Sequence, residues 1–210
     1  MIKILVADDH PIVRRGLRQV IAEIPDVQVT GEAGSSEEVL EKMRSEYFNM
    51  VILDISLPGI GGLNVLKKVR EMKDAPAVLI VSFHTEEEYA IRAFKIGACG
   101  YLTKDSVEEE LHTAIERILE GRKYVCNALA DKLPLILRED GNEPPHRKLS
   151  DREYEIMCRI AQGEPLKAVA SGLRLNSRTV STYRGRILSK LNMTSNSELV
   201  RYVLDHHLLD

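Results

Sequence analysis

The chain has no tryptophan, only three phenylalanines and only three cysteines among its 210 residues. The cysteines lie far apart and none belongs to a Cys-x-x-Cys pair, which excludes a disulfide framework and a zinc knuckle. Long apolar runs are also missing. The first run, Ile4 to Ala7, is cut off by Asp8, so the sequence predicts neither a membrane span nor a secretory signal. We therefore expect a cytoplasmic protein.

The composition is that of a globular protein, with 44% hydrophobic and 29% charged residues. These values exclude wholesale disorder and a coiled coil, and the length allows one mid-sized domain or two small ones. The net charge of −3 is unevenly distributed, because five basic residues and no acidic residue lie between Arg174 and Lys190. This basic region favours an anionic partner, nucleic acid first, although it would equally suit a solvated helix face.

Short apolar runs alternate with helically spaced segments over the first 121 residues. Most of these runs are continuous rather than alternating, which is typical of strands buried on both faces. Five strand–helix alternations predict a doubly wound, flavodoxin-like α/β fold with a five-stranded parallel sheet in the order 2-1-3-4-5. The predicted strands are Ile2 to Ala7, Val27 to Ala33, Met50 to Asp54, Ala77 to Ser82 and Gly100 to Thr103.

The pattern changes after Gly121. Leu129, Leu133 and Ile136 predict one more amphipathic helix, followed by a polar, Gly- and Pro-containing linker. From Leu149 the spacing is helical only and predicts a compact bundle of four short helices. We therefore predict a domain at 1–121, a linker helix and flexible linker at 122–148, and a small all-α domain at 149–210.

Polar side chains end four of the predicted strands. Asp8 and Asp9 follow the first strand and Asp54 ends the third, so the strand order brings three carboxylates together. Such a cluster repels itself unless a hard divalent cation, Mg²⁺ or Mn²⁺, neutralises it. Ser82 ends the fourth strand and Lys104 follows the fifth. Taken singly, each residue could be an ordinary cap, strand end or surface group, but together they indicate phosphoryl transfer to a carboxylate.

The strings KILVADDHPIVRRGL, VILDISLPGIGG, VLIVSFH and GACGYLTKD resemble the receiver domain of two-component response regulators, over about residues 1–121. The resemblance implies a phosphoacceptor, a metal site and a conformational switch. Carried over position by position, it implies Asp54 as phosphoacceptor, Asp8 and Asp9 as the metal-binding pair, the backbone carbonyl of Ser56 as a further metal ligand, Ser82 as the switch hydroxyl, Lys104 as the phosphoryl-binding lysine and Tyr101 as the switch aromatic.

The residue after Ser82 departs from the common receiver pattern. It is often small in the family but is Phe83 here, a change that would crowd access to the phosphoryl group. His84 and Ser56 occupy positions similar to ones that tune phosphoryl lifetime in the family, although His84 also suits a solvated loop.

A helix-turn-helix is predicted near the C-terminus. Leu166 to Leu173 forms a first helix, a turn runs through Asn176, and Ser177 can cap a second helix that reaches Leu191. An ordinary helical hairpin with a basic face would share this pattern. Arginines would reach phosphates, and hydroxyls and a glycine would approach the groove floor. The candidate DNA-contacting residues are Arg174, Arg178, Thr179, Ser181, Thr182, Arg184, Gly185, Arg186 and Lys190.

The strings LSDREYEI and IAQGEPLKAVASGLRLNSRTVSTYRGRILSKL resemble the LuxR-type DNA-binding domain, over roughly residues 149–210. The whole chain then resembles the NarL/FixJ class of response regulators. Ala168, Ser181 and Gly185 replace residues that are charged in many members, so the target sequence does not follow from the resemblance.

The predicted function is a transcription factor switched by phosphorylation of Asp54, and not an enzyme beyond its own phosphorylation and dephosphorylation. The implied partners are a sensor histidine kinase, double-stranded promoter DNA and a second copy of the chain after phosphorylation. RNA polymerase is a further candidate partner, and no membrane is expected. Two other functions remain open: a phospho-switched module that binds protein, and a Mg²⁺-dependent phosphohydrolase. The hydrolase would need a cap insertion, and the sequence contains none.

Overall fold

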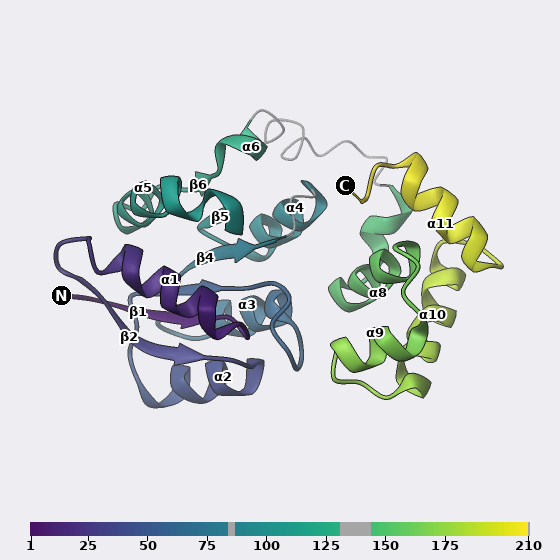
Figure 1. Ribbon diagram of the computed structural model, residues 1–210, viewed down its shortest axis with the longest axis horizontal. Coiled ribbons are helices and arrows are strands. Elements are labelled where there is room, and N and C mark those ends of the chain that lie inside the picture. Colours follow the sequence, from purple (N-terminus) through teal and green to yellow (C-terminus); the bar gives the residue numbers. More distant parts are fainter. Residues whose placement is uncertain (84–86, 131–143, 210) are drawn as a thin grey trace. The chain divides into compact units, whose positions relative to one another are not determined.

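The computed structural model describes residues 1–83, 87–130 and 144–209, which belong to two compact units, Met1–Leu137 and Arg138–Asp210 (Figure 1). Of the helix predicted between the domains, Leu129 is described and buried, whereas Leu133 and Ile136 lie outside the described residues. No helix in the described ranges has the length and apolar character needed to cross a membrane.

The first unit is built on a parallel sheet in the order β2-β1-β3-β4-β5-β6. The predicted order of the first five strands is confirmed. The sixth strand was not predicted, because two residues are too few to produce a periodic pattern. The strands are β1 (Ile2–Ala7), β2 (Val27–Ala33), β3 (Met50–Leu53), β4 (Ala77–Ser82), β5 (Gly100–Thr103) and β6 (Tyr124–Val125).

Helices cover both faces of this sheet, α1 and α5 on one face and α2, α3 and α4 on the other (Figure 1). The side chains of β3 and most of those of β1 and β4 are buried, which explains why these segments read as continuous apolar runs. The helices are α1 (Pro11–Ile21), α2 (Ser36–Ser45), α3 (Gly62–Arg70), α4 (Glu87–Ile96), α5 (Val107–Leu119) and the short α6 (Asn127–Ala130), with a 3₁₀ turn η1 (Lys104–Ser106) before α5.

The second unit contains four α-helices among its described residues, as predicted. A 3₁₀ turn, η2 (Pro145–Lys148), precedes them, and the ring nitrogen Nδ1 of its buried His146 lies 3.0 Å from the Tyr202 hydroxyl. The end of the predicted linker is therefore folded against this unit. The helices are α8 (Asp151–Ala161), α9 (Leu166–Gly172), α10 (Ser177–Lys190) and α11 (Asn196–Asp205).

Candidate phosphoryl-transfer site and nucleic-acid interface

Three carboxylates meet at the carboxyl edge of the sheet. β1 and β3 are paired in register at Ala7 and Leu53, so Asp8 and Asp54 leave adjacent strands side by side. The amide of Asp54 donates to the Ala7 carbonyl at 2.9 Å, which extends this pairing to the acidic residues themselves. Asp8 and Asp54 are each only 2% exposed, and Asp9 lies at the rim.

Lys104 lies between two of these carboxylates. Its Nζ is 2.5 Å from Asp8 Oδ2 and 3.0 Å from Asp54 Oδ2, and its side chain is 4% exposed. Burial raises the pKa of Asp54, Lys104 lowers it and Asp8 raises it, and the net pKa is above the ordinary value. Burial lowers the pKa of Lys104, but the two carboxylates more than reverse this. One ammonium therefore serves two buried carboxylates, and the pocket retains excess negative charge.

The residues present fit a divalent cation. One ligand atom each from Asp8, Asp9, His10 and Asp54 lies within 4.8 Å of the others. Asp9 Oδ1 is buried and receives no hydrogen bond among the described residues, and its polar neighbour is His10 Nδ1 at 2.8 Å. A buried carboxylate oxygen of this kind suits a ligand of a hard cation. Ser56 lies beside this cluster, because its amide donates to Asp54 Oδ1 at 3.2 Å.

Gly62 allows α3 to begin directly against the acidic cluster. A Cβ atom at this position would lie 2.0 Å from the Asp54 carbonyl oxygen and 2.8 Å from the Cα atom of Ile55. No side chain can be accommodated there without moving the backbone that carries Asp54. The glycine pair in the VILDISLPGIGG string is thus explained in part by this close approach.

The other predicted switch residues lie on β4 and β5. Ser82 and Tyr101 are fully buried, and Ser82 pairs in register with Thr103, the residue before Lys104. The strand ends that carry the hydroxyl and the ammonium are therefore neighbours. The structure thus brings Ser82 and Lys104 to the same edge of the sheet as the three carboxylates, whereas Tyr101 lies inside the fold.

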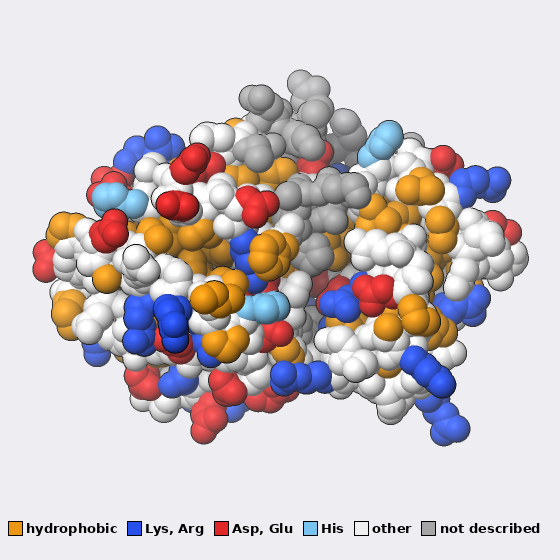
Figure 2. Space-filling view, viewed as in Figure 1, with side chains coloured by type: hydrophobic (Ala, Val, Ile, Leu, Met, Phe, Trp, Pro, Cys, Tyr) orange, Lys and Arg blue, Asp and Glu red, His pale blue; other side chains and the backbone are white. Residues whose placement is uncertain are grey.

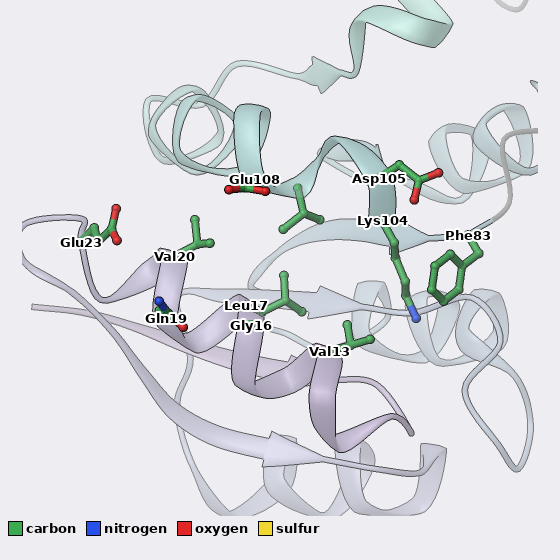
Figure 3. A pocket seen from close by; sticks show the side chains of 11 residues that line it. Val13, Gly16, Leu17, Gln19, Val20, Glu23, Phe83, Lys104, Asp105 and Glu108 are labelled. Atoms are coloured by element: carbon green, nitrogen blue, oxygen red, sulfur yellow. The ribbon is translucent and has the colours of Figure 1, made fainter.

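Phe83 covers the ammonium of Lys104. The Nζ atom is 4.6 Å from the centroid of the Phe83 ring, which is within cation–π range, and Phe83 is 62% exposed (Figure 3). The sequence predicted crowding by Phe83 but not this contact, which depends on side-chain conformation. His84 lies outside the described residues.

A groove runs from this site between α1 and α5, with a volume of about 530 Å³. Figure 2 shows hydrophobic side chains gathered over these two helices. Val13, Leu17 and Val20 of α1 line the groove on one side and Glu108 of α5 lies on the other, with Phe83 and Lys104 at its end (Figure 3). Val107, the first residue of α5, also lines the groove. The sequence does not reveal this groove, because the helical spacing that places Leu17 in the core does not show that Val13 and Val20 remain half-exposed.

The N-cap of α10 is Asn176, not the predicted Ser177. Asn176 Oδ1 accepts hydrogen bonds from the amide of Thr179 at 2.7 Å and from the Thr179 hydroxyl at 2.9 Å. Asparagine caps at least as well as serine, and the residue with extended backbone takes the role. The hydroxyl of Thr179, a candidate DNA contact, therefore takes part in the cap.

The outer face of α10 presents most of the predicted basic and small side chains. A Cβ atom on Gly185 would meet nothing within 4 Å, so the backbone is open there to an approaching surface. Arg184 is half-buried, and its Nε donates to Asn196 Oδ1 at 2.6 Å. The exposed candidates are Arg174, which precedes α10, and on the helix itself Arg178, Ser181, Thr182, Gly185, Arg186 and Lys190.

Lys190 is paired within the unit. Its Nζ lies 2.6 Å from Oε2 of Glu153, and that carboxylate is 4% exposed and also accepts the Ser150 amide at the start of α8. Burial acts to raise the pKa of Glu153, but the hydrogen bonds from Lys190 and Ser150 outweigh it, so the pKa lies below its ordinary value. Lys190 thus stabilises the fold of this unit.

We expect Glu153→Gln to lower the stability of the full chain by about 1–3 kcal/mol at neutral pH, because charged hydrogen bonds to a buried group are lost. A lowered pKa contributes stability above the unfolded pKa, and this contribution disappears as pH falls through the folded pKa. The difference in free energy of unfolding between the variant and the unchanged protein should therefore shrink on acidification. Urea unfolding followed by circular dichroism at pH 7.5 and at pH 4 measures this difference. The exposed Asp205→Asn serves as a control, and a difference that grows on acidification would contradict the assignment.

Comparison with known proteins gives the same two units. Residues 4–116 match the family model "Response regulator receiver domain", and residues 147–203 match "Bacterial regulatory proteins, luxR family". The chain is 32% identical over 209 residues to the response regulator UvrY of Escherichia coli K12, covering 99% of this chain and 96% of UvrY. It is 35% identical over 211 residues to the response regulator GacA of Pseudomonas aeruginosa, covering 100% of this chain and 99% of GacA.

Solved structures share the fold. RcsB from Salmonella enterica serovar Typhimurium, bound to the promoter rprA in the presence of the phosphomimetic BeF3−, superimposes with a TM-score of 0.67. The match covers 97% of this chain and 98% of that one at 21% identity. At this identity the likeness concerns the fold alone.

Proposed function

The chain belongs to the NarL/FixJ class of two-component response regulators, and on this premise we propose that Asp54 accepts a phosphoryl group and that α10 binds promoter DNA. A transcription regulator of this class has a histidine kinase and DNA as partners. We further propose that the chain acts in the cytoplasm and pairs with a second copy after phosphorylation.

The observation that carries the phosphorylation proposal is the position of Lys104 between Asp8 and Asp54. An oxygen of Asp54 attacks phosphorus, and the bond from phosphorus to the donor, a histidine ring nitrogen of the kinase, breaks. The Lys104 ammonium, 3.0 Å from Asp54 Oδ2, is placed to contact the oxygens of the arriving group. The Ser82 hydroxyl, on the neighbouring strand end, is placed to donate to the same group.

Mg²⁺ or Mn²⁺ bound by Asp8, Asp9, Asp54 and the Ser56 carbonyl would neutralise charge on the transferred group. The fit rests on the buried Asp9 Oδ1 and on the excess negative charge of the pocket. Loss of the phosphoryl group to water uses the same residues, so the chain promotes only its own phosphorylation and dephosphorylation.

The DNA-binding proposal rests on the exposed face of α10, where Arg178, Thr182 and Arg186 surround the open backbone at Gly185. The promoter bound to RcsB supports it by analogy of fold. We propose that the arginines contact phosphates and that Ser181 and Thr182 approach base edges. Lys190 and Arg184 are proposed as weaker contacts, because each already has a partner within the unit.

Phosphorylation is expected to raise affinity for DNA with two half-sites. One small domain reads few base pairs, and a dimer raises the effective concentration of the second reading helix. Coupling of about 1–3 kcal/mol corresponds to a gain of roughly 5- to 150-fold. Fluorescence anisotropy with BeF3−-treated and untreated full-length protein, on one-site and two-site DNA, measures the gain. Equal affinities in all four combinations would rule out phosphorylation control of binding.

Phe83→Ala is expected to speed phosphorylation by a small donor such as acetyl phosphate about two- to fivefold. The ring covers the Lys104 ammonium, and a cation–π contact at an exposed site is worth about 0.5–1 kcal/mol that the donor must displace. Phosphoryl loss should accelerate in parallel, because water gains the same access. Phe83→Leu keeps apolar bulk but has no ring face, so it separates loss of the cation–π contact from loss of steric cover over Lys104. Slower phosphorylation of Phe83→Ala would show that the ring assists rather than shields Lys104.

A further inference from the structure

His10 lies beside the acidic cluster and its imidazole does not cap α1. The residue is the N-cap of that helix with extended backbone, but its side chain makes no capping hydrogen bond. The backbone amide of His10 donates to Asp8 Oδ1 at 2.7 Å, which fixes the main chain directly over the carboxylates. Pro11 follows at the first helical position and restricts the backbone further. The ring is therefore held at the site by its main chain and by a 3.2 Å hydrogen bond between Nδ1 and Asp8 Oδ1, and it takes no part in capping the helix.

The imidazole nitrogen is spaced from two carboxylates as ligands of one cation are. Nδ1 is 2.8 Å from Asp9 Oδ1 and 3.2 Å from Asp8 Oδ1. Two neighbouring ligands on an octahedral cation, each about 2.1 Å from it, lie about 3 Å apart. Asp9 Oδ1 is buried without a hydrogen-bond partner in the described part of the chain, although the imidazole nitrogen is close by. The oxygen and the nitrogen are therefore close enough to each other to be ligands of one cation.

Nitrogen ligands change which cation a site prefers. Carboxylates and carbonyls suit Mg²⁺, whereas imidazole suits first-row transition metals, which bind N/O sites with rising affinity from Mn²⁺ to Co²⁺ and beyond. We propose that His10 is a ligand in the metal site of this chain and that it shifts the preference of the site from Mg²⁺ towards transition-metal dications. This inference rests on the proposed phosphorylation site, since it shares Asp8, Asp9 and Asp54 with it.

If His10 were a counter-charge and not a ligand, its removal would have the opposite effect on cation binding. An imidazolium that only neutralises Asp8 and Asp9 would compete with every cation, so its removal would strengthen binding of Mg²⁺ and Co²⁺ alike. A ligand nitrogen, in contrast, contributes to Co²⁺ binding and little to Mg²⁺ binding. The ratio of the two affinities therefore separates a ligand from a counter-charge.

Calorimetric titration of the unphosphorylated full-length protein with CoCl₂ and with MgCl₂ tests the proposal. His10→Ala should weaken Co²⁺ binding at least about tenfold and change Mg²⁺ binding less than about twofold. Because the side chain makes no capping bond, α1 should persist, which circular dichroism verifies. His112→Ala, an exposed histidine on α5, controls for binding by surface histidines.

Pulsed electron paramagnetic resonance on the Mn²⁺-loaded protein gives an independent readout. Modulation from a directly bound ¹⁴N nucleus should be present in the unchanged protein and absent in His10→Ala. An unchanged ratio of Co²⁺ to Mg²⁺ affinity, a parallel rise of both, or ¹⁴N modulation that survives the substitution would overturn the role of His10. If the unchanged protein binds neither cation, the proposed metal site itself fails, which is a different result.

Discussion

Asp54→Asn is expected to abolish incorporation of a phosphoryl group from small donors and from a kinase. The amide cannot act as the attacking carboxylate, and loss of a nucleophile costs at least about 10³-fold in rate. Asp9→Asn should slow the reaction strongly but leave the acceptor in place. Incorporation is measured by the mobility shift on a phosphate-affinity gel after incubation with acetyl phosphate and Mg²⁺. Asp74→Asn, an exposed aspartate on the same unit, should react like the unchanged protein.

The same variant should remain folded. Burial raises the pKa of Asp54, so the folded state favours the protonated carboxyl group and the ionised form opposes folding. The stability contributed by the protonated group is present at low pH and is lost as pH rises through the folded pKa. At pH 7.5 without divalent cation, Asp54→Asn is therefore expected to melt at the same or a higher temperature than the unchanged protein. Labelling of the variant at the normal rate would mean that another residue accepts the phosphoryl group.

Binding of a dimer to DNA should weaken by about 10³- to 10⁴-fold when monovalent salt rises from 50 to 200 mM, and binding of a single copy by about 60-fold. Arg174, Arg178 and Arg186 are exposed, so about three phosphate contacts per copy are expected. The slope of log K against log salt is then about −3 for one copy and near −6 for a dimer. Affinities measured on an operator selected in vitro, across a series of salt concentrations, give this slope.

Single substitutions divide the interface into positioning and reading residues. Arg178→Ala should lower affinity for all sequences and reduce the steepness of the slope by about one per copy. Thr182→Ala should change which sequence is preferred. Lys73→Ala removes the same charge from an exposed position of the first unit and should have no effect. A slope near zero would exclude α10 as the DNA-binding surface.

The sequence predicted the strands and their order because buried parallel strands form continuous apolar runs. It also placed Asp8, Asp54 and Lys104 together, since the predicted strand order brings the ends of these strands close together at one edge of the sheet. The sequence did not predict the two-residue strand β6. It also did not show that Asn176, and not Ser177, is the N-cap of α10. The first is too short for any periodicity, and the second depends on where the backbone turns from extended to helical.

Contacts between particular side chains are the other part that the sequence did not reveal. Lys190 was predicted to contact DNA from its basic character, but Glu153, far away in the chain, holds its ammonium. The ring of Phe83 over Lys104 and the imidazole of His10 beside Asp9 likewise depend on side-chain conformations. No pattern of residue types along the chain encodes such conformations.

The short strand β6 has a practical consequence for anyone who isolates the receiver. The amides of Tyr124 and Cys126 donate to the carbonyls of Cys99 and Tyr101, both at 3.0 Å, and the Tyr124 hydroxyl donates to Glu110 at 2.7 Å. A fragment cut after α5 would expose the outer edge of β5 as an unpaired template, the feature by which sheets add strands from neighbouring molecules and precipitate. A fragment that continues through Ala130 keeps this edge covered and should stay monodisperse at concentrations where the shorter fragment aggregates.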